Sequence, residues 1–209
     1  MRIQIKGILA LSIALTVTAI GAPNNGVFKD SRDGQKYKKV KIGKQVWMAE
    51  NLNYKMEGSY CYENDETHCE KYGRLYEWDA AMKACPKGWH LPDKTEFEVL
   101  FDAVGGISIA AKMLKSTDGW DVVMKGGRFV TGGGTDEYGF SALPAGVKGP
   151  VERGGFFAAE TLGTIFQCST KNKDKDGSYS FTLAIDGDKV IVADNADKSR
   201  AASVRSVKD

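Results

Sequence analysis

Residues 91–104 read LPDKTEFEVLFDAV and carry the clearest structural signal in the chain. A proline is followed by Asp93 and, three residues later, by Glu96, which is the pattern of an acidic N-cap with its reciprocal partner. The next apolar residues are spaced at i, i+3, i+4 and i+7, so they share one face of a helix; they are Phe97, Leu100, Phe101 and Val104. This stretch predicts an amphipathic helix that packs on a core and ends at Gly105-Gly106.

Two more helices are expected on either side of this one. Upstream, four apolar residues spaced by three, four and three predict a helix over residues 73–84. Downstream, residues 107–115 predict a short third helix before a turn. The first half of the chain is therefore expected to supply the helices.

Strand patterns lie before and after these helices. Residues 37–42 and 45–49 are β-prone and separated by two residues, which predicts a hairpin. After Trp120 the chain reads as short strands and loops, with Asp186-Gly187 as a second hairpin signal. The strand candidates there are 156–159, 164–169, 179–185, 189–193 and 203–207. The whole pattern predicts an α+β fold with two main helices packed on short antiparallel sheets.

The N-terminus has the order of features of a secretory signal peptide. Two basic residues precede an uncharged apolar run over residues 7–20, which is too short for a comfortable membrane span. We expect residues 1–21 to be a signal peptide, 22–26 a flexible leader, and 27–209 a single domain with no membrane span after cleavage. The expected location is secreted, periplasmic or on the outer surface of a bacterium.

The charge balance argues against nucleic acid as a partner. The chain has 29 Lys+Arg and 27 Asp+Glu, a formal net charge of +2. Cleavage after residue 21 would remove Arg2 and Lys6 and leave no net charge. The lysines between residues 36 and 44 alternate with apolar residues, which is typical of the solvated face of a strand. No basic patch able to neutralise several phosphates is expected.

The four cysteines are Cys61, Cys69, Cys85 and Cys168. An exported protein meets an oxidising compartment, so disulfides are expected, and four cysteines allow three connectivities. Cys61 and Cys69 flank a polar segment that a local bridge would close, whereas a bridge from Cys85 to Cys168 would join the helical and sheet halves. Zinc held by the cysteines and histidines is the alternative, but the paired CxxC spacing is missing, and we expect no metal.

No familiar catalytic motif accompanies these cysteines. The chain contains no GxSxG, no HExxH and no Walker A loop, and the glycines at 132–134 precede acidic residues that would repel a phosphate. Cys168 as a free catalytic thiol remains an alternative to its use in a disulfide. We therefore expect no catalytic residues and no cofactor.

Several short segments of the sequence resemble the Fibrobacter succinogenes major paralogous domain, a family of exported bacterial proteins. The resemblance covers about residues 27–209. The resemblance lies in five segments: VWMAENL at 46–52, YGRLYEW at 72–78, CPKGWHLP at 85–92, GFSALPAG at 139–146 and Ser203-Val204-Arg205. The segment CPKGWHLP at 85–92 is also similar to a segment of C-type-lectin-like and formylglycine-generating-enzyme-like domains. That similarity implies a C-type-lectin-like fold, stapled by disulfides, with neighbouring termini.

This chain departs from the family pattern at one cysteine. The family usually has Cys directly after the Ser-Val-Arg segment, where this chain has Ser206. The family's long bridge from Cys85 to the terminal strand is therefore impossible, and the resemblance implies that Cys168 replaces the missing partner.

The function expected from these observations is a secreted or cell-surface, non-catalytic binding module, with carbohydrate favoured as ligand. Aromatic side chains offer flat apolar faces with polar rims, and the ligand-binding candidates are Tyr60, Tyr62, Trp120 and Tyr138. A polysaccharide or a surface protein is the expected partner. A structural or protein-partner domain is the first alternative, and an enzyme of the formylglycine-generating type, using Cys168, is the second.

Overall fold

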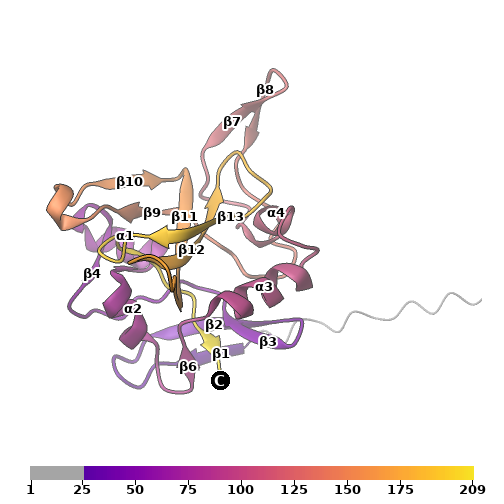
Figure 1. Cartoon of the computed structure of the whole chain (residues 1–209). Coiled ribbons are helices and arrows are strands. Elements are labelled where there is room, and N and C mark those ends of the chain that lie inside the picture. The colour runs from indigo at the N-terminus through magenta and orange to yellow at the C-terminus, as the bar shows by residue number, and fades with distance from the viewer. Residues whose placement is uncertain (1–25) are drawn as a thin grey trace, which may run out of the picture.

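A computed structural model describes residues 26–209 of the protein. The predicted signal peptide and residues 22–25 of the leader lie outside the described residues. Within the described part, most of the regular structure is β, arranged as two larger sheets and a separate hairpin, with four short α-helices beside them (Figure 1). The expectation of an α+β fold with two main helices packed on short antiparallel sheets is thus right only in part, because strands supply most of the framework.

The first sheet is antiparallel and contains both ends of the described chain. The C-terminal strand lies between two strands from the first half, so the last residues complete the sheet. Its order is β1 (Gly26–Lys29), β2 (Lys36–Ile42), β3 (Gln45–Met48), β15 (Val207–Lys208) and β6 (Trp89–His90). The predicted hairpin is confirmed as β2–β3, with Ile42 paired to Gln45.

The second sheet is mixed, because its central strand pairs in parallel with two neighbours. Its main path is β10 (Phe157–Glu160), β9 (Ala145–Lys148), β11 (Gly163–Lys171), β14 (Ala202–Ser203), β5 (Leu75–Tyr76) and β4 (Ser59–Tyr60). Two more strands, β12 (Ser178–Ala184) and β13 (Ile191–Ala196), extend from β11. A separate hairpin, β7 (Val122–Lys125) and β8 (Arg128–Thr131), projects from the body (Figure 1).

The best-defined helix is α3 (Lys94–Ala103), as the sequence predicted. Asp93 Oδ1 accepts the Glu96 amide at 2.8 Å, and Glu96 Oε2 accepts the Asp93 amide at 2.9 Å, which completes the capping box. The upstream helix, α2 (Trp78–Ala84), begins later than expected because Leu75 and Tyr76 pair with β14 instead. The other two helices are α1 (Glu66–Tyr72), which the sequence did not reveal, and α4 (Ala110–Leu114).

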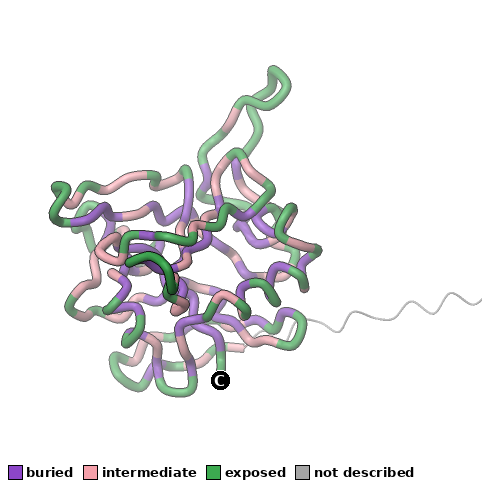
Figure 2. Tube along the Cα trace, in the orientation of Figure 1, coloured by how far each residue is buried: buried purple, intermediate pink, exposed green. Residues whose placement is uncertain are grey.

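The core is aromatic and lies between α3 and the β11–β12 pair. Phe97 from the helix meets Phe181 with ring centroids 4.4 Å apart and Trp47 at 5.3 Å. All four tryptophans of the chain are buried, with at most 9% of any residue exposed. Figure 2 shows buried residues concentrated in the body, whereas the β7–β8 hairpin is largely exposed. None of the helices formed by residues 26–209 is long and apolar enough to cross a membrane.

Only one of the two expected disulfide bonds is present. Cys61 and Cys69 form a disulfide, with Cα atoms 5.0 Å apart. The predicted bridge from Cys85 to Cys168 is wrong, because both thiols are free. Cys168 is fully buried among the residues of the α3 core, whereas Cys85 packs against a different cluster beneath the first sheet, so the fold keeps them in separate parts of the interior.

Candidate functional site

A polar hollow of about 270 Å³ lies between β2 and α1 and is named here the β2–α1 hollow. Four segments far apart in sequence form its walls. These are 35–38 at β2, 49–53 after β3, 69–73 at the end of α1, and Ser141 and Leu143. Its volume is slightly below the range of about 300–1,000 Å³ typical of small-molecule pockets, so it suits a small group or one unit of a longer ligand.

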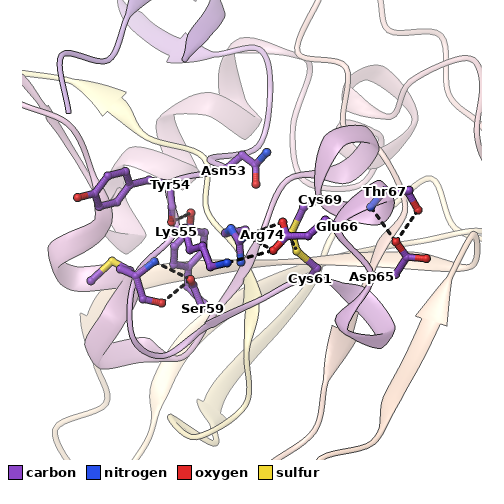
Figure 3. The surroundings of a disulfide bond; sticks show 12 residues. Asn53, Tyr54, Lys55, Ser59, Cys61, Asp65, Glu66, Thr67, Cys69 and Arg74 are labelled. Carbon is purple, nitrogen blue, oxygen red and sulfur yellow. Dashed lines mark hydrogen bonds and ion pairs between the residues drawn. A yellow bond between two sulfur atoms is a disulfide. The ribbon is translucent and has the colours of Figure 1, made fainter. Parts of the chain in front are cut away.

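The disulfide corner holds the α1 wall in place (Figure 3). The Asp65 carboxylate accepts the Thr67 amide at 2.9 Å and caps the helix, and the bridge ties Cys69 in α1 to Cys61 before it. Both carboxylate oxygens of Glu66 accept a hydrogen bond from Arg74 Nη2, Oε2 at 2.7 Å and Oε1 at 3.0 Å. These hydrogen bonds hold the Glu66 pKa below its usual value. The short helix is therefore fixed at its start, and its last residues line the hollow.

The opposite wall is anchored by the buried side-chain amide of Asn51. Asn51 Nδ2 donates to the Tyr72 carbonyl at 2.8 Å, which ties the segment after β3 to the end of α1. Asn51 Oδ1 accepts from Arg205 Nε at 2.6 Å. Because Asn51 is buried and both its donor and its acceptor are used, it serves to shape the hollow, and its amide is not free for a ligand.

Other lining groups have capacity left for a ligand. Asn53 Oδ1 is enclosed and has no hydrogen-bond partner among residues 26–209. Glu50 accepts the Lys38 amide at 2.7 Å through one carboxylate oxygen. Lys36, Glu70 and Lys71 are exposed residues that also line the hollow, and Lys71 Nζ lies 4.6 Å from the centre of the Tyr72 ring. The Tyr37 hydroxyl is committed, since it accepts the Asn53 amide at 3.1 Å, and burial raises the Tyr37 pKa to about 12.

This set of groups fits a neutral ligand rich in hydroxyls. A hydroxyl both donates and accepts, so it can give a hydrogen bond to a carboxylate and receive one from an ammonium group. Both signs of charge are present at the rim, so the wall does not select strongly for an ion of one sign. The enclosed Asn53 acceptor, which has no partner among the described residues, carries an energetic cost.

The structure does not bring the four predicted ligand residues together, and none of them lines the β2–α1 hollow. Trp120 and Tyr62 are only 7% and 9% exposed, so they offer no open face. The Trp120 indole donates to Ser116 Oγ at 3.0 Å, and the Tyr62 ring stacks on His68 with centroids 5.5 Å apart. Both side chains complete local packing, and a role for either in ligand binding stays a prediction.

The other two predicted residues are partly accessible. Tyr60 donates its hydroxyl to Glu77 Oε1 at 2.7 Å, and Lys148 Nζ lies 4.1 Å from the centre of its ring. Tyr138 packs partly buried against the α3 core. A role for either in ligand binding stays a prediction.

The free thiols lie in environments that favour the neutral form. Burial raises the pKa of both Cys85 and Cys168 to about 11. A nucleophilic cysteine needs the opposite, a pKa lowered by nearby positive charge. Cys61, Cys69 and Glu66 lie close enough to hold a metal ion by distance alone, but the two sulfurs are bonded to each other and are not thiolate ligands.

Sequence reasoning missed the β2–α1 hollow because its walls come from four separate segments. The one available signal was the set of lysines that alternate along β2. Lys36 and Lys38 do lie exposed, as a solvated strand face requires, but they also border the hollow.

Comparison with known proteins identifies one family. The model of the Fibrobacter succinogenes major domain matches residues 40–208. No curated protein and no solved structure matches the chain.

Proposed function

The chain belongs to the Fibrobacter succinogenes major domain family, and we propose that it acts as an exported, non-catalytic binding module for a carbohydrate. The β2–α1 hollow is the proposed site. The proposal includes a C-type-lectin-like fold. Its support is that β1 and β15, at the two ends of the described chain, belong to one sheet.

The observation that carries the proposal is the unpartnered acceptor of Asn53 inside a polar hollow. Its Oδ1 atom is enclosed and lacks a donor among the described residues, and residues with carboxylate and ammonium groups line the same hollow. A rotation of the Asn53 side chain toward the hollow would let a sugar hydroxyl supply the missing donor, and the same hydroxyl can accept from a lysine that lines the hollow. Aromatic stacking contributes less than the sequence suggested, since the tryptophans are buried.

Binding to a glycan array and to insoluble polysaccharides tests the ligand class, followed by calorimetry with each ligand found. Asn53→Ala removes the acceptor without breaking a side-chain hydrogen bond of Oδ1, so stability should hold while affinity falls about fivefold, the value of one hydrogen bond. Lys36→Ala should also weaken binding, whereas its matched control Lys41→Ala, exposed on the same strand but outside the hollow, should not.

Two results would contradict this function. One is a blank array together with blank polysaccharide pull-downs. The other is glycan binding that neither Asn53→Ala nor Lys36→Ala changes, which would place the ligand elsewhere.

Export is a separate part of the proposal. It rests on residues 1–21, whose basic start and apolar run have the order of a signal peptide. Mass spectrometry of protein recovered from the cell surface and culture fluid should find an N-terminus near residue 22. Recovery of the intact chain from the cytoplasm alone would contradict it.

A protein-partner domain is the second candidate function. The β7–β8 hairpin favours it, because it projects from the body (Figure 1) and exposes large apolar side chains.

A further inference from the structure

The β7–β8 hairpin exposes an apolar pair next to an unpaired cationic pair. Met124 and Phe129 face each other across the strands and are 66% and 73% exposed. Lys125 and Arg128 form the next pair, at the tip and on the opposite face of the hairpin, and neither has an ion-pair partner among the described residues. Isolated exposed apolar residues are ordinary, but a projecting group of them is typical of an interaction site.

The base of the hairpin is firmly held, so its tip is presented in a defined position. Lys115 Nζ donates to the Gly132 carbonyl at 2.7 Å, directly after β8. Thr161 Oγ1 donates to Asp121 Oδ2 at 2.7 Å, directly before β7. A surface fixed in advance loses less conformational entropy when it binds.

A second surface has the complementary chemistry. Two adjoining hollows, of about 320 and 450 Å³, share Glu77 and Asp79 and are together named the acidic hollow. Met56, Tyr60 and Ala80 give it apolar surface. Five carboxylates line it, against the ammonium groups of Lys83 and Lys198: Glu57, Glu77, Asp79, Asp176 and Asp197.

Most of this negative charge is not neutralised within the chain. Lys198 pairs with Asp176 at 2.5 Å, and Arg153 approaches Asp197 at 3.9 Å. The other three carboxylates of the acidic hollow have no ion pair within residues 26–209. The hollow thus offers apolar surface and unpaired anions, while the hairpin tip offers apolar side chains and unpaired cations.

We propose that the hairpin tip of one copy of this chain docks in the acidic hollow of a second copy. The hairpin projects away from the part of the body that contains α2 and β4, which border the acidic hollow (Figure 1). The contact therefore joins two different surfaces of the same chain and repeats head to tail. The contact does not involve the β2–α1 hollow, so it does not depend on carbohydrate binding there.

Charge-reversal variants test the two surfaces separately in sedimentation-velocity experiments over a range of protein concentrations. The wild-type protein should associate as its concentration rises, and added salt should weaken that association. Lys125→Glu with Arg128→Glu should weaken it about tenfold or more, as should Glu57→Lys with Asp79→Lys. The matched controls are Lys41→Glu with Lys44→Glu and Glu98→Lys with Asp102→Lys, all exposed sites, and they should associate like the wild type.

Mixing the two defective variants gives the sharpest result. The hairpin variant keeps an intact hollow and the hollow variant keeps an intact hairpin, so an equal mixture should form a 1:1 dimer and no larger species. Phe129→Ser should weaken wild-type association at every salt concentration, whereas Phe156→Ser, exposed elsewhere, should not.

The proposal is overturned if the wild-type protein stays monomeric at all concentrations, or if the mixed variants fail to pair. Flotation with phosphatidylglycerol vesicles separates a different occupant. If the monomer binds these vesicles and loses that binding in Phe129→Ser, the hairpin is a membrane-contacting surface instead.

Discussion

Ser206 Oγ lies 2.9 Å from Cys85 Sγ and donates a hydrogen bond to it. The two residues are 121 positions apart and meet where α2 ends and the C-terminal segment enters the first sheet. The resemblance implied a family bridge between these two positions, and in this chain the Ser206 hydroxyl takes the place beside the Cys85 sulfur. Cys168 does not replace the lost partner, because it lies in another part of the core.

Restoring the missing sulfur should therefore restore a bridge. In Ser206→Cys, we expect a disulfide with Cys85 that raises the free energy of unfolding by about 4 to 5 kcal/mol, since it closes a long loop. Thiol labelling in denaturant without reductant should find two free thiols in the wild type and one in the variant. Three free thiols in Ser206→Cys would contradict the prediction, and adding Cys168→Ser should leave the new bridge intact.

Arg205 is a second long-range contact whose removal should be costly. Its fully buried guanidinium donates to Asn51 Oδ1 at 2.6 Å, to the Ser141 carbonyl at 2.8 Å and to the carbonyls of Met48 and Phe140. Arg205→Met would leave several buried acceptors without a donor, at about 1 to 3 kcal/mol each. We expect a loss of at least about 3 kcal/mol in urea unfolding, against less than about 0.5 kcal/mol for the exposed control Arg128→Met.

His90 should make stability depend on pH. Its Nδ1 lies 2.6 Å from Asp209 Oδ1 and its Nε2 lies 2.8 Å from Glu96 Oε1. Burial lowers the His90 pKa, but the hydrogen bonds to the two carboxylates outweigh burial and raise it above 6.5. A raised folded-state pKa contributes stability below the unfolded value and loses it as pH rises through the folded value.

Unfolding measurements between pH 6 and pH 9 check this sign. We expect wild-type stability to fall with rising pH in part of that window, and His90→Gln to show a smaller slope. A slope equal to that of the wild type would contradict the assignment to His90. His68→Gln is the comparison variant, since His68 contacts one carboxylate, Glu160, and not two.

Lys115 should control the order of the projecting hairpin. Its buried ammonium donates to the carbonyls of Gly132 at 2.7 Å and of Ala184 and Gly187 at 3.1 Å, and burial lowers its pKa. Lys115→Met would detach the base of β8 from the loop after β12. We expect faster hydrogen exchange across residues 122–131, while Lys112→Met, an exposed control in α4 shortly before Lys115, should exchange like the wild type.

The sequence alone determined the features that depend on neighbours a few positions away. Asp93 and Glu96 predicted the start of α3, the two-residue gap predicted the β2–β3 hairpin, and the polar segment between Cys61 and Cys69 predicted their bridge. Each is a contact between groups that the chain itself keeps close. Spacing and residue type therefore suffice to identify them.

Tertiary structure decided everything that joins distant segments. It set Cys85 against Ser206, buried Trp120 and Tyr62, and turned residues 75 and 76 into a strand where helical spacing had predicted a helix. It also assembled the β2–α1 hollow from four separate stretches. Such contacts depend on which strands pair and which faces pack, and the same local pattern is compatible with several partners until the whole core forms.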